Sequence, residues 1–150
     1  MPQNLLFPRI TSILASAAQT VTVTIPKFVL PLADAYTFYL NSTTVTGTSP
    51  TLDVVFQTSI DGGTTYVNIP WRYAQQTAAA VNIMTVRCGL GIGEVGAETA
   101  VAATGGTLNK PCVFDPNFMK AVFTIAGTSP SFTVSLTSIA LPRGSMSTGA

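Results

Sequence analysis

The sequence predicts an all-β chain, a single β-sandwich of the jelly-roll or immunoglobulin-like kind with extended terminal arms. Apolar residues recur at every second position in several short segments, which is typical of strands with one face in a core. Turn signals rich in Gly, Pro and Asp separate these segments, and no stretch keeps the periodicity of a capped helix. At 150 residues the chain has the length of one domain with a substantial core, so we treat residues 1–150 as a single domain.

A turn followed by a strand occurs twice, displaced by 80 positions. The first copy begins with Gly47-Thr48-Ser49-Pro50 and the second with Gly127-Thr128-Ser129-Pro130. The alternating apolar residues that follow, which we expect in the core, are Leu52, Val54 and Phe56 in the first copy and Phe132, Val134 and Leu136 in the second. Because each copy follows another strand-like segment, residues 36–40 or 121–125, each copy predicts a β-hairpin.

The segments before the first copy are a possible arm and an edge strand. Residues 1–16 form either an arm that reaches a neighbouring subunit or a short first strand, and the sequence leaves both open. Residues 21–25 alternate cleanly and predict a strand. Pro26 and Pro31 then indicate an edge or a crossover, since Pro cannot donate to a strand ladder.

Between the two copies, the chain predicts a hairpin, a strand and a long loop. Asp61-Gly62-Gly63 separates residues 52–59 from 66–71 and is a strong hairpin signal, because such turns need positive φ. Residues 81–86 resume strand character. We expect residues 89–107 to be a Gly-rich loop insertion, with residues 99–103 as a possible strand, and residues 142–150 to be a flexible or docked C-terminal tail.

The chain is apolar and weakly charged, which suggests burial in an assembly. Only 9% of residues are charged, against roughly 25% in ordinary soluble domains, while the mean hydropathy is +0.44. The most apolar stretch, residues 28–40, is interrupted by Pro31 and Asp34 and is too short for a spanning helix. The N-terminus resembles no secretion signal, so we expect no membrane partner and reduced, buried thiols at Cys88 and Cys112 rather than a disulfide. We therefore expect a homo-oligomer with wide, uncharged interfaces.

The sequence offers little chemistry for catalysis, metal binding or nucleic-acid binding. It contains no His, and its seven Lys and Arg residues are scattered singly. The Gly-x-Gly-x-x-Gly pattern of residues 91–96, with Asp115 downstream, lacks the β-α-β context of a dinucleotide site. Glu94 and Glu98 are expected to be solvated loop acids, and no cofactor or metal is expected. Asp61 is expected to be a turn residue rather than, with Asp53 and Asp115, a Ca²⁺ ligand.

Three aromatic residues leave a binding function open. Tyr66, Trp71 and Tyr73 could form a platform for a sugar in a carbohydrate-binding module for host adhesion. The alternative is that Tyr66 and Trp71 pack in the core or at a protein interface, where aromatic residues are enriched.

Two blocks of the chain resemble a family of small virion proteins encoded among the head genes of tailed bacteriophages and prophages. The shared pattern is Gly-Thr-Ser-Pro-Thr-Leu-Asp-Val at residues 47–54, the Asp-Gly-Gly-Thr-Thr-aromatic turn at 61–66, and Gly-Thr-Ser-Pro-Ser-Phe-Thr-Val at 127–134. The match covers about a third of the chain, residues 36–66 and 118–139. It departs from the family at Tyr66 and Lys120, where Trp and Arg are usual, and in the longer loop at 89–107.

The resemblance implies a β-sandwich head decoration, or cement, protein on the outer surface of a phage capsid, assembled in the host cytoplasm. Such a protein would bridge neighbouring subunits of the major capsid protein and stabilise the head, most simply as a trimer. A tail, connector or spike component with the same sandwich is the alternative within the virion. None of these functions involves catalysis, so we do not expect the protein to be an enzyme. We expect the repeated hairpins to be scaffold and the contacts with partners to lie in the termini and in residues 89–107.

Overall fold

The computed structural model describes residues 9–87, 99–101, 106–109 and 114–142. These residues form strands and no helix, which confirms the all-β prediction. Among them, therefore, no helix could cross a membrane. The strands are β1 (Arg9–Gln19), β2 (Val23–Phe28), β3 (Ala33–Ser59), β4 (Tyr66–Tyr73), β5 (Ala80–Arg87), β6 (Thr99–Val101), β7 (Gly106–Asn109) and β8 (Met119–Pro142).

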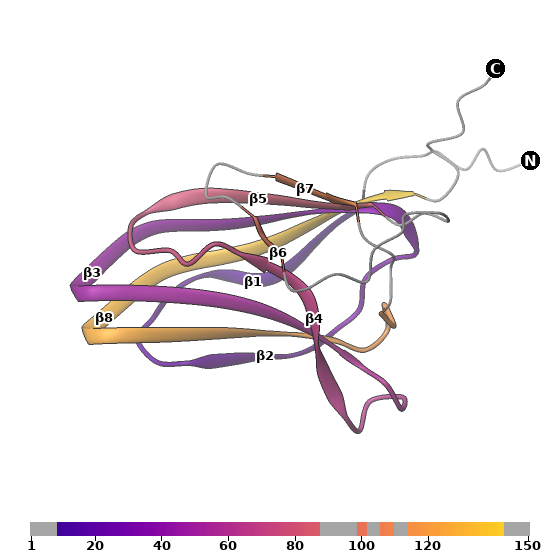
Figure 1. The fold of residues 1–150 in the computed structure, drawn as a ribbon, viewed down its shortest axis with the longest axis horizontal. Coiled ribbons are helices and arrows are strands. Elements are labelled where there is room, and N and C mark those ends of the chain that lie inside the picture. The colour runs from indigo at the N-terminus through magenta and orange to yellow at the C-terminus, as the bar shows by residue number, and fades with distance from the viewer. Residues whose placement is uncertain (1–8, 88–98, 102–105, 110–113, 143–150) are drawn as a thin grey trace, which may run out of the picture.

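Two very long strands, β3 and β8, organise the molecule. They have 27 and 24 residues, contain the two copies of the repeat, and pair with each other antiparallel along almost their whole length. Figure 1 shows them side by side, bending together at the same end of the molecule. The prediction of two separate hairpins is therefore wrong, because Tyr39 pairs with Thr137 and Phe56 pairs with Ala121. Each repeat pairs with the strand segment that precedes the other copy, and not with the segment that precedes it in the chain.

The Gly-Thr-Ser-Pro segments bend the two paired strands at the same place, where Thr48 pairs with Thr128. Gly47 and Gly127 have φ of 109° and 125°, and Ser49 and Ser129 both have φ of 49°, so each strand changes direction without reversing within its own sheet. The two bends contact each other closely. A Cβ at Gly47 would lie 2.7 Å from the carbonyl oxygen of Ser129, and a Cβ at Gly127 would lie 2.8 Å from that of Ser49.

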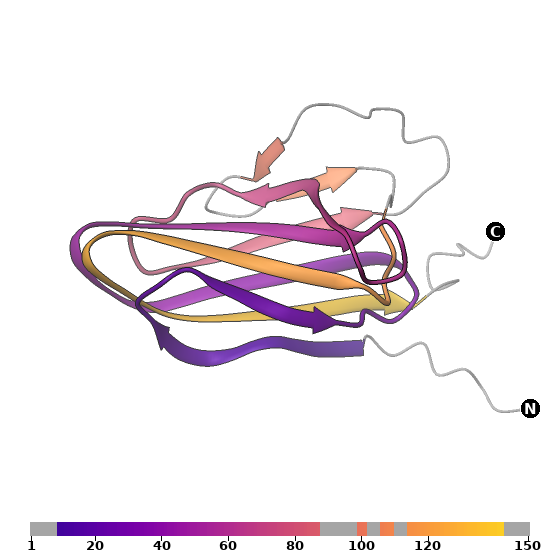
Figure 2. The same cartoon turned by 90° about the horizontal axis from the view of Figure 1, so that it is seen from below.

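The bend folds the hydrogen-bonded strands into two layers, which face each other in Figure 1 and lie one behind the other in Figure 2. The first layer contains residues 33–46 of β3, residues 131–142 of β8, and strands β1, β5 and β7. The second contains residues 51–59 of β3, residues 119–126 of β8, and strands β2, β4 and β6. Most pairs are antiparallel, but β4 with β6 and β5 with β7 are parallel.

The core lies between the two layers. Phe38 of the first layer meets Phe56 of the second, with ring centroids 4.8 Å apart. The six core residues expected from the repeats are all buried, with at most 1% of their surface exposed. Burial of each such side chain stabilises the fold by about 1.5–3 kcal/mol relative to leaving it in water. The prediction of these core residues is confirmed.

The pairing has an internal two-fold symmetry that relates the two copies of the repeat. Thr48 pairs with Thr128, its own equivalent 80 positions later. The pair Leu52 and Ile125 is matched by the pair Val45 and Phe132, as a two-fold axis through the bend requires. The outer strands follow the same rule, because β4 and β5 flank the two halves of β3 while β1 and β2 flank the two halves of β8. The unit β3-β4-β5 therefore has a circularly permuted counterpart, β8-β1-β2.

Most of the other elements expected from the sequence correspond to strands or turns of the structure. Residues 9–16 of the possible N-terminal arm belong to strand β1, so the alternative of a first strand is correct for that part, whereas residues 1–8 lie outside the described residues. The strand expected at 21–25 is β2, a little later in the chain, and Pro26 lies in it where it pairs only with β8 among the described strands. The 61–63 hairpin joins β3 to β4 as expected. Part of the 89–107 loop forms β6 and the start of β7, whereas residues 88–98, 102–105 and 143–150 lie outside the described residues.

Candidate interaction surface

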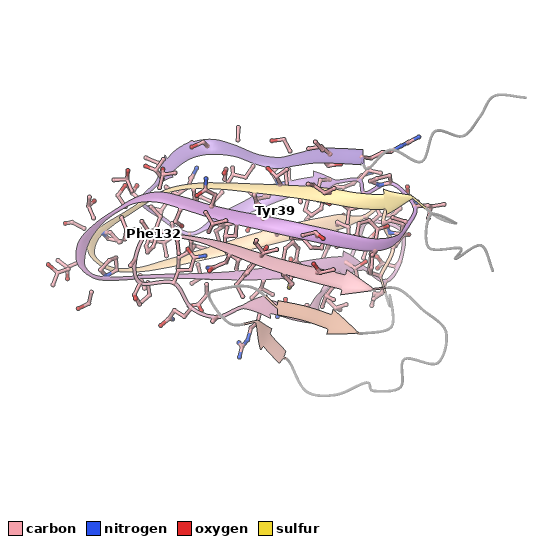
Figure 3. The ribbon with its side chains drawn as sticks, turned by 90° about the horizontal axis from the view of Figure 1, so that it is seen from above. Tyr39 and Phe132 are labelled. Atoms are coloured by element: carbon pink, nitrogen blue, oxygen red, sulfur yellow. The ribbon has the colours of Figure 1, made fainter. Side chains whose placement is uncertain are left out.

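The outer surface of the first layer includes a broad uncharged face, formed by side chains that the structure describes; Arg87 continues β5 beyond it, and its side chain is not among those described. Side chains alternate along a strand, so the residues between the buried positions of β8, β3 and β5 point outward. They form three cross-strand rows: Ile139–Thr37–Thr85, Thr137–Tyr39–Ile83 and Ser135–Asn41–Val81. We call these nine residues the uncharged face. Figure 3 views the molecule from this side and labels Tyr39 on β3.

Hydroxyl and apolar groups, together with the amide of Asn41, make up this face. The Thr37 and Thr85 hydroxyls lie 3.1 Å apart, within hydrogen-bond distance across the strands. Val81 is 54% exposed, and Ile10 of β1, which pairs with Ile139 beside the face, is 72% exposed. Apolar side chains left in water next to hydroxyls, without charges to desolvate, are suited to contact with another protein.

The outer surface of the second layer is different, because it contains charged residues. Lys120 of β8 places its ammonium 3.9 Å from the ring centroid of Tyr66, and Asp53 of β3 accepts a hydrogen bond of 2.8 Å from the Gln75 amide. Arg72 of β4 pairs with Val55 on the same side and is exposed. A contact over this surface would have to desolvate or pair these charges, which costs free energy that the uncharged face does not demand.

Asp61 organises the hairpin between β3 and β4. Its Oδ1 accepts hydrogen bonds from the backbone N–H groups of Thr64 and Thr65, at 3.0 and 2.7 Å, and from the Ser59 hydroxyl at 3.0 Å. These bonds, led by those from Thr65, lower the pKa of the carboxyl below its ordinary value. They give Asp61 the role of a turn residue, which confirms that prediction.

The acids considered as Ca²⁺ ligands have separate roles in the structure. Asp115 accepts a bond from the Asn117 N–H at 2.9 Å, and its own N–H donates to the Thr58 hydroxyl at 2.8 Å. Asp53 is engaged with Gln75 instead, as described above. Within the described ranges, no three His, Cys, Asp or Glu side chains lie close enough together to hold a metal ion. Residues 91–96, Glu94, Glu98, Cys88 and Cys112 lie outside the described residues.

One of the three aromatic residues considered for a sugar platform, Tyr73, is buried. Tyr73 is 2% exposed, and its hydroxyl donates to the Phe38 carbonyl at 2.8 Å, so Tyr73 belongs to the core. Burial also raises the pKa of this phenol strongly. Tyr66 packs against Lys120 on the second layer. The backbone of Trp71 pairs with Thr99, but its side chain is not among those described. The core position of Tyr73 was therefore missed from the sequence.

A buried polar cluster at the β4–β5 connection was missed from the sequence. The Ser42 hydroxyl donates to the Gln76 Oε1 at 2.8 Å, and Asn82 lies beside Gln76 along a cavity of about 140 Å³. The signal was present, because Asn82 is in phase with Met84 and Val86, which are both fully buried. A buried amide that lacks a partner destabilises a fold by about 1–3 kcal/mol, so such a residue is unusual in a core.

A second cavity, of about 360 Å³, lies where β1 begins and β8 ends. Its lining in the described part of the chain consists of Arg9, Pro31, Leu32 and Ala140. Leu32 is 69% exposed, and the Pro31 carbonyl accepts a bond of 2.6 Å from the Tyr36 hydroxyl, which fixes this edge of the cavity. Its lining offers one cation and apolar surface, with no acid or nucleophile among these four residues.

Comparison with known proteins adds no relative from which a function could be transferred. No protein-family model matches this chain, and no similar protein was found among curated sequences or among solved structures. The indications of function are therefore the uncharged face and the sequence pattern.

Proposed function

We propose that this chain is a structural protein of a bacteriophage virion, a decoration or cement protein that bridges subunits of the major capsid protein and stabilises the head. The observation that carries the proposal is the uncharged face of the first layer. The resemblance of residues 36–66 and 118–139 to head-region virion proteins supports it. The role is mechanical and assigns no catalytic residue, metal or cofactor.

The physical case rests on the difference between the two outer surfaces. Interface cores are depleted of charge and enriched in aromatic residues, and the uncharged face places Tyr39 among Thr, Ser, Ile and Val side chains. The second layer holds Asp53, Arg72 and Lys120 on its outer side. We propose that the first layer faces capsid protein or neighbouring copies and the second layer faces solvent. A homotrimer over a capsid symmetry axis, built as a β-sandwich, is the assembly we propose.

The proposal is tested by adding purified protein to expanded capsids that lack it, made from the major capsid protein encoded with this chain. We expect saturable binding at a fixed number of copies per capsid and a higher temperature of capsid disruption. Protein that stays in the supernatant at concentrations well above that of capsid sites would contradict the proposal. Binding to purified tails rather than heads would assign the chain to the tail or connector instead.

A further inference from the structure

Strand β1 has an outer edge that pairs with no other strand in the described part of the chain. One side of β1 is hydrogen-bonded to β8, from Arg9 opposite Ala140 to Gln19 opposite Phe132. No described strand lies on its other side, and Figures 2 and 3 show β1 at the margin of the first layer. We call this outer side of residues 9–19 the β1 edge. An unpaired strand edge presents a row of N–H and C=O groups that another strand can bind.

The other three edges of the two layers, as far as the structure describes them, have features that discourage pairing and that β1 lacks. β6 and β7 have only 3 and 4 residues. β2 has 6 residues and contains Pro26 and Lys27; Pro has no N–H to donate, and a Lys ammonium has to stay in water. β1 has 11 residues and no Pro, and its single charge is Arg9 at its first position. The chain therefore leaves one long edge open.

The internal two-fold symmetry shows that a strand built like β1 can accept another strand on its outer edge. β4, the equivalent of β1, shifts register opposite residues 55–57 of β3, and β1 does so opposite residues 134–137 of β8, which overlap with 55–57 after the displacement of 80 positions. Beyond its shift, β4 pairs with β6 through residues 71–73. β6 lies in the long connection from β5 to β8, whereas the equivalent connection from β2 to β3 is residues 29–32 and contains no strand. The β1 edge therefore lacks the cover that its counterpart has.

A second copy of this chain has the edge that matches β1. Addition of a strand needs a partner with a free edge of similar length, and β1 itself is such an edge. Antiparallel pairing brings Arg9 of each copy to Gln19 of the other, where the guanidinium can donate to the amide oxygen. Parallel pairing in register would instead place two Arg9 cations side by side, which is unfavourable. Antiparallel pairing is also self-complementary, as a two-fold interface requires.

We propose that two copies of this protein join through their β1 edges, paired antiparallel about a two-fold axis. The axis is perpendicular to the sheet, so the first layers become one continuous sheet with both uncharged faces on the same side. Ile10, which is 72% exposed, would pack against the added strand. This inference does not rest on the capsid role, because it follows from the open edge. A two-fold contact cannot lie within a ring of three, so in the proposed assembly it would join neighbouring trimers.

The test looks for contacts between copies of the whole protein by NMR. Isotopically labelled and unlabelled chains are mixed and equilibrated, so that isotope-filtered NOEs report contacts between one copy and another. We expect such NOEs between Ile10 of one copy and Ala18 of the other, since antiparallel pairing places the two ends of β1 together. Amide hydrogen exchange in residues 9–19 should also slow as the protein concentration rises, whereas exchange in residues 23–28 of β2 should not change.

Two Lys variants test whether the β1 edge carries the association. Ser16→Lys adds a charge to an exposed position of β1, near the proposed two-fold axis, so the two copies would repel each other. Its self-association, measured by sedimentation equilibrium, should be weaker by at least about tenfold in dissociation constant. Thr24→Lys is the matched control, because Thr24 is also exposed but belongs to β2. Thr24→Lys should associate like the unmodified chain.

The proposal is overturned if the chain shows no self-association up to about 1 mM. It is also overturned if the chain associates without NOEs between β1 strands, or if the two Lys variants weaken association equally. Protection of β1 that appears only when capsids are added would assign the β1 edge to capsid protein and not to a second copy. Self-association through β1 in protein that ignores capsids would support this inference while contradicting the proposed function, so the two can fail separately.

Discussion

At the scale of single residues, Asp61 shows most directly how a sequence signal predicts a local geometry. An Asp before two glycines predicts a turn, and the structure shows its carboxylate accepting from Thr64, Thr65 and Ser59. Acceptance of several N–H and O–H bonds favours the charged form, which is why the pKa of Asp61 is lowered. The hairpin should therefore depend on pH.

Acidification should loosen the β3–β4 hairpin. The pKa of Asp61 is lower in the folded state than in the unfolded state, so its stabilisation is complete above the unfolded value and is lost as the pH falls through the folded value. Amide hydrogen exchange at Thr65, corrected for intrinsic rates and measured from about pH 5 down to about pH 2, should show protection falling with acid. In Asp61→Asn, which keeps an oxygen acceptor but does not titrate, the protection should be flat. Equal pH profiles in the two proteins would refute this role.

Single residues also show which features of burial and contact the sequence predicts. The burial of Tyr73 could have been predicted, because it is in phase with Ile69, and both side chains are buried. The burial of Asn82 followed from the same alternation rule, but a polar residue suggests an outward position unless its neighbours are weighed first. The partners that these side chains meet, such as the Phe38 carbonyl for Tyr73, come from distant parts of the chain and have no local signature.

At the scale of elements, the repeated turn determines the architecture. The sequence correctly predicts strands on either side of Gly-Thr-Ser-Pro, but it predicts hairpins where the structure has two continuous bent strands. The reason is that a Gly and a Pro between two strands usually indicate reversal within one sheet. Here the positive φ of Gly47 and Ser49 turns the strand into the other layer, and the pairing partner lies 80 residues away. Such non-local pairing cannot be deduced from the alternation of one segment.

Gly47→Ala should be strongly destabilising. Its φ of 109° is unfavourable for any side chain, and the new Cβ would lie 2.7 Å from a backbone oxygen in the other bend. We expect a loss of at least about 2 kcal/mol in the free energy of unfolding, measured by urea denaturation. Gly62→Ala is the matched control, because its φ is also positive, at 73°, but nothing lies within 4 Å of the added atom. It should lose only about 1 kcal/mol, and equal losses at the two sites would show that contact between the bends is unimportant.

At the scale of the whole molecule, the internal two-fold relates β3-β4-β5 to β8-β1-β2. The hairpin that joins β3 to β4 occupies the position that, in the other unit, falls between β8 and β1. Those strands end side by side, since Arg9 pairs with Ala140. The fold should therefore tolerate a chain that is closed between β8 and β1 and opened between β3 and β4, because these two connections lie at symmetry-equivalent places.

A circular permutant tests this symmetry. Joining residue 150 to residue 1 through a Gly/Ser linker and opening the chain between Gly62 and Gly63 should give a folded protein. We expect it to retain the β-rich circular dichroism spectrum and to lose less than about 3 kcal/mol of stability, since only the connections between strands change. Opening the chain between Gly47 and Thr48 instead would break β3 at the bend and should prevent cooperative folding. If both permutants folded equally well, or if neither folded, the internal symmetry would not determine where the chain can be opened.

The proposed role in assembly depends on which outer surface meets a partner. A Lys introduced at Thr137, in the middle row of the uncharged face, would have to be desolvated when the face is covered. A Lys at Thr124 is the matched control, because Thr124 is exposed on the second layer and pairs with Asp53. Both positions are on the outer side of β8, so neither change disturbs the core.

The most direct measurement is the binding of Thr137→Lys and Thr124→Lys to capsids that lack the protein, compared with the unmodified chain in the same sedimentation assay. We predict that Thr137→Lys loses binding by at least about a hundredfold in affinity, whereas Thr124→Lys binds like the unmodified chain. Circular dichroism confirms in each case that the variant is folded. Undiminished binding of Thr137→Lys, or loss of binding only in Thr124→Lys, would contradict the assignment of the uncharged face as the assembly surface.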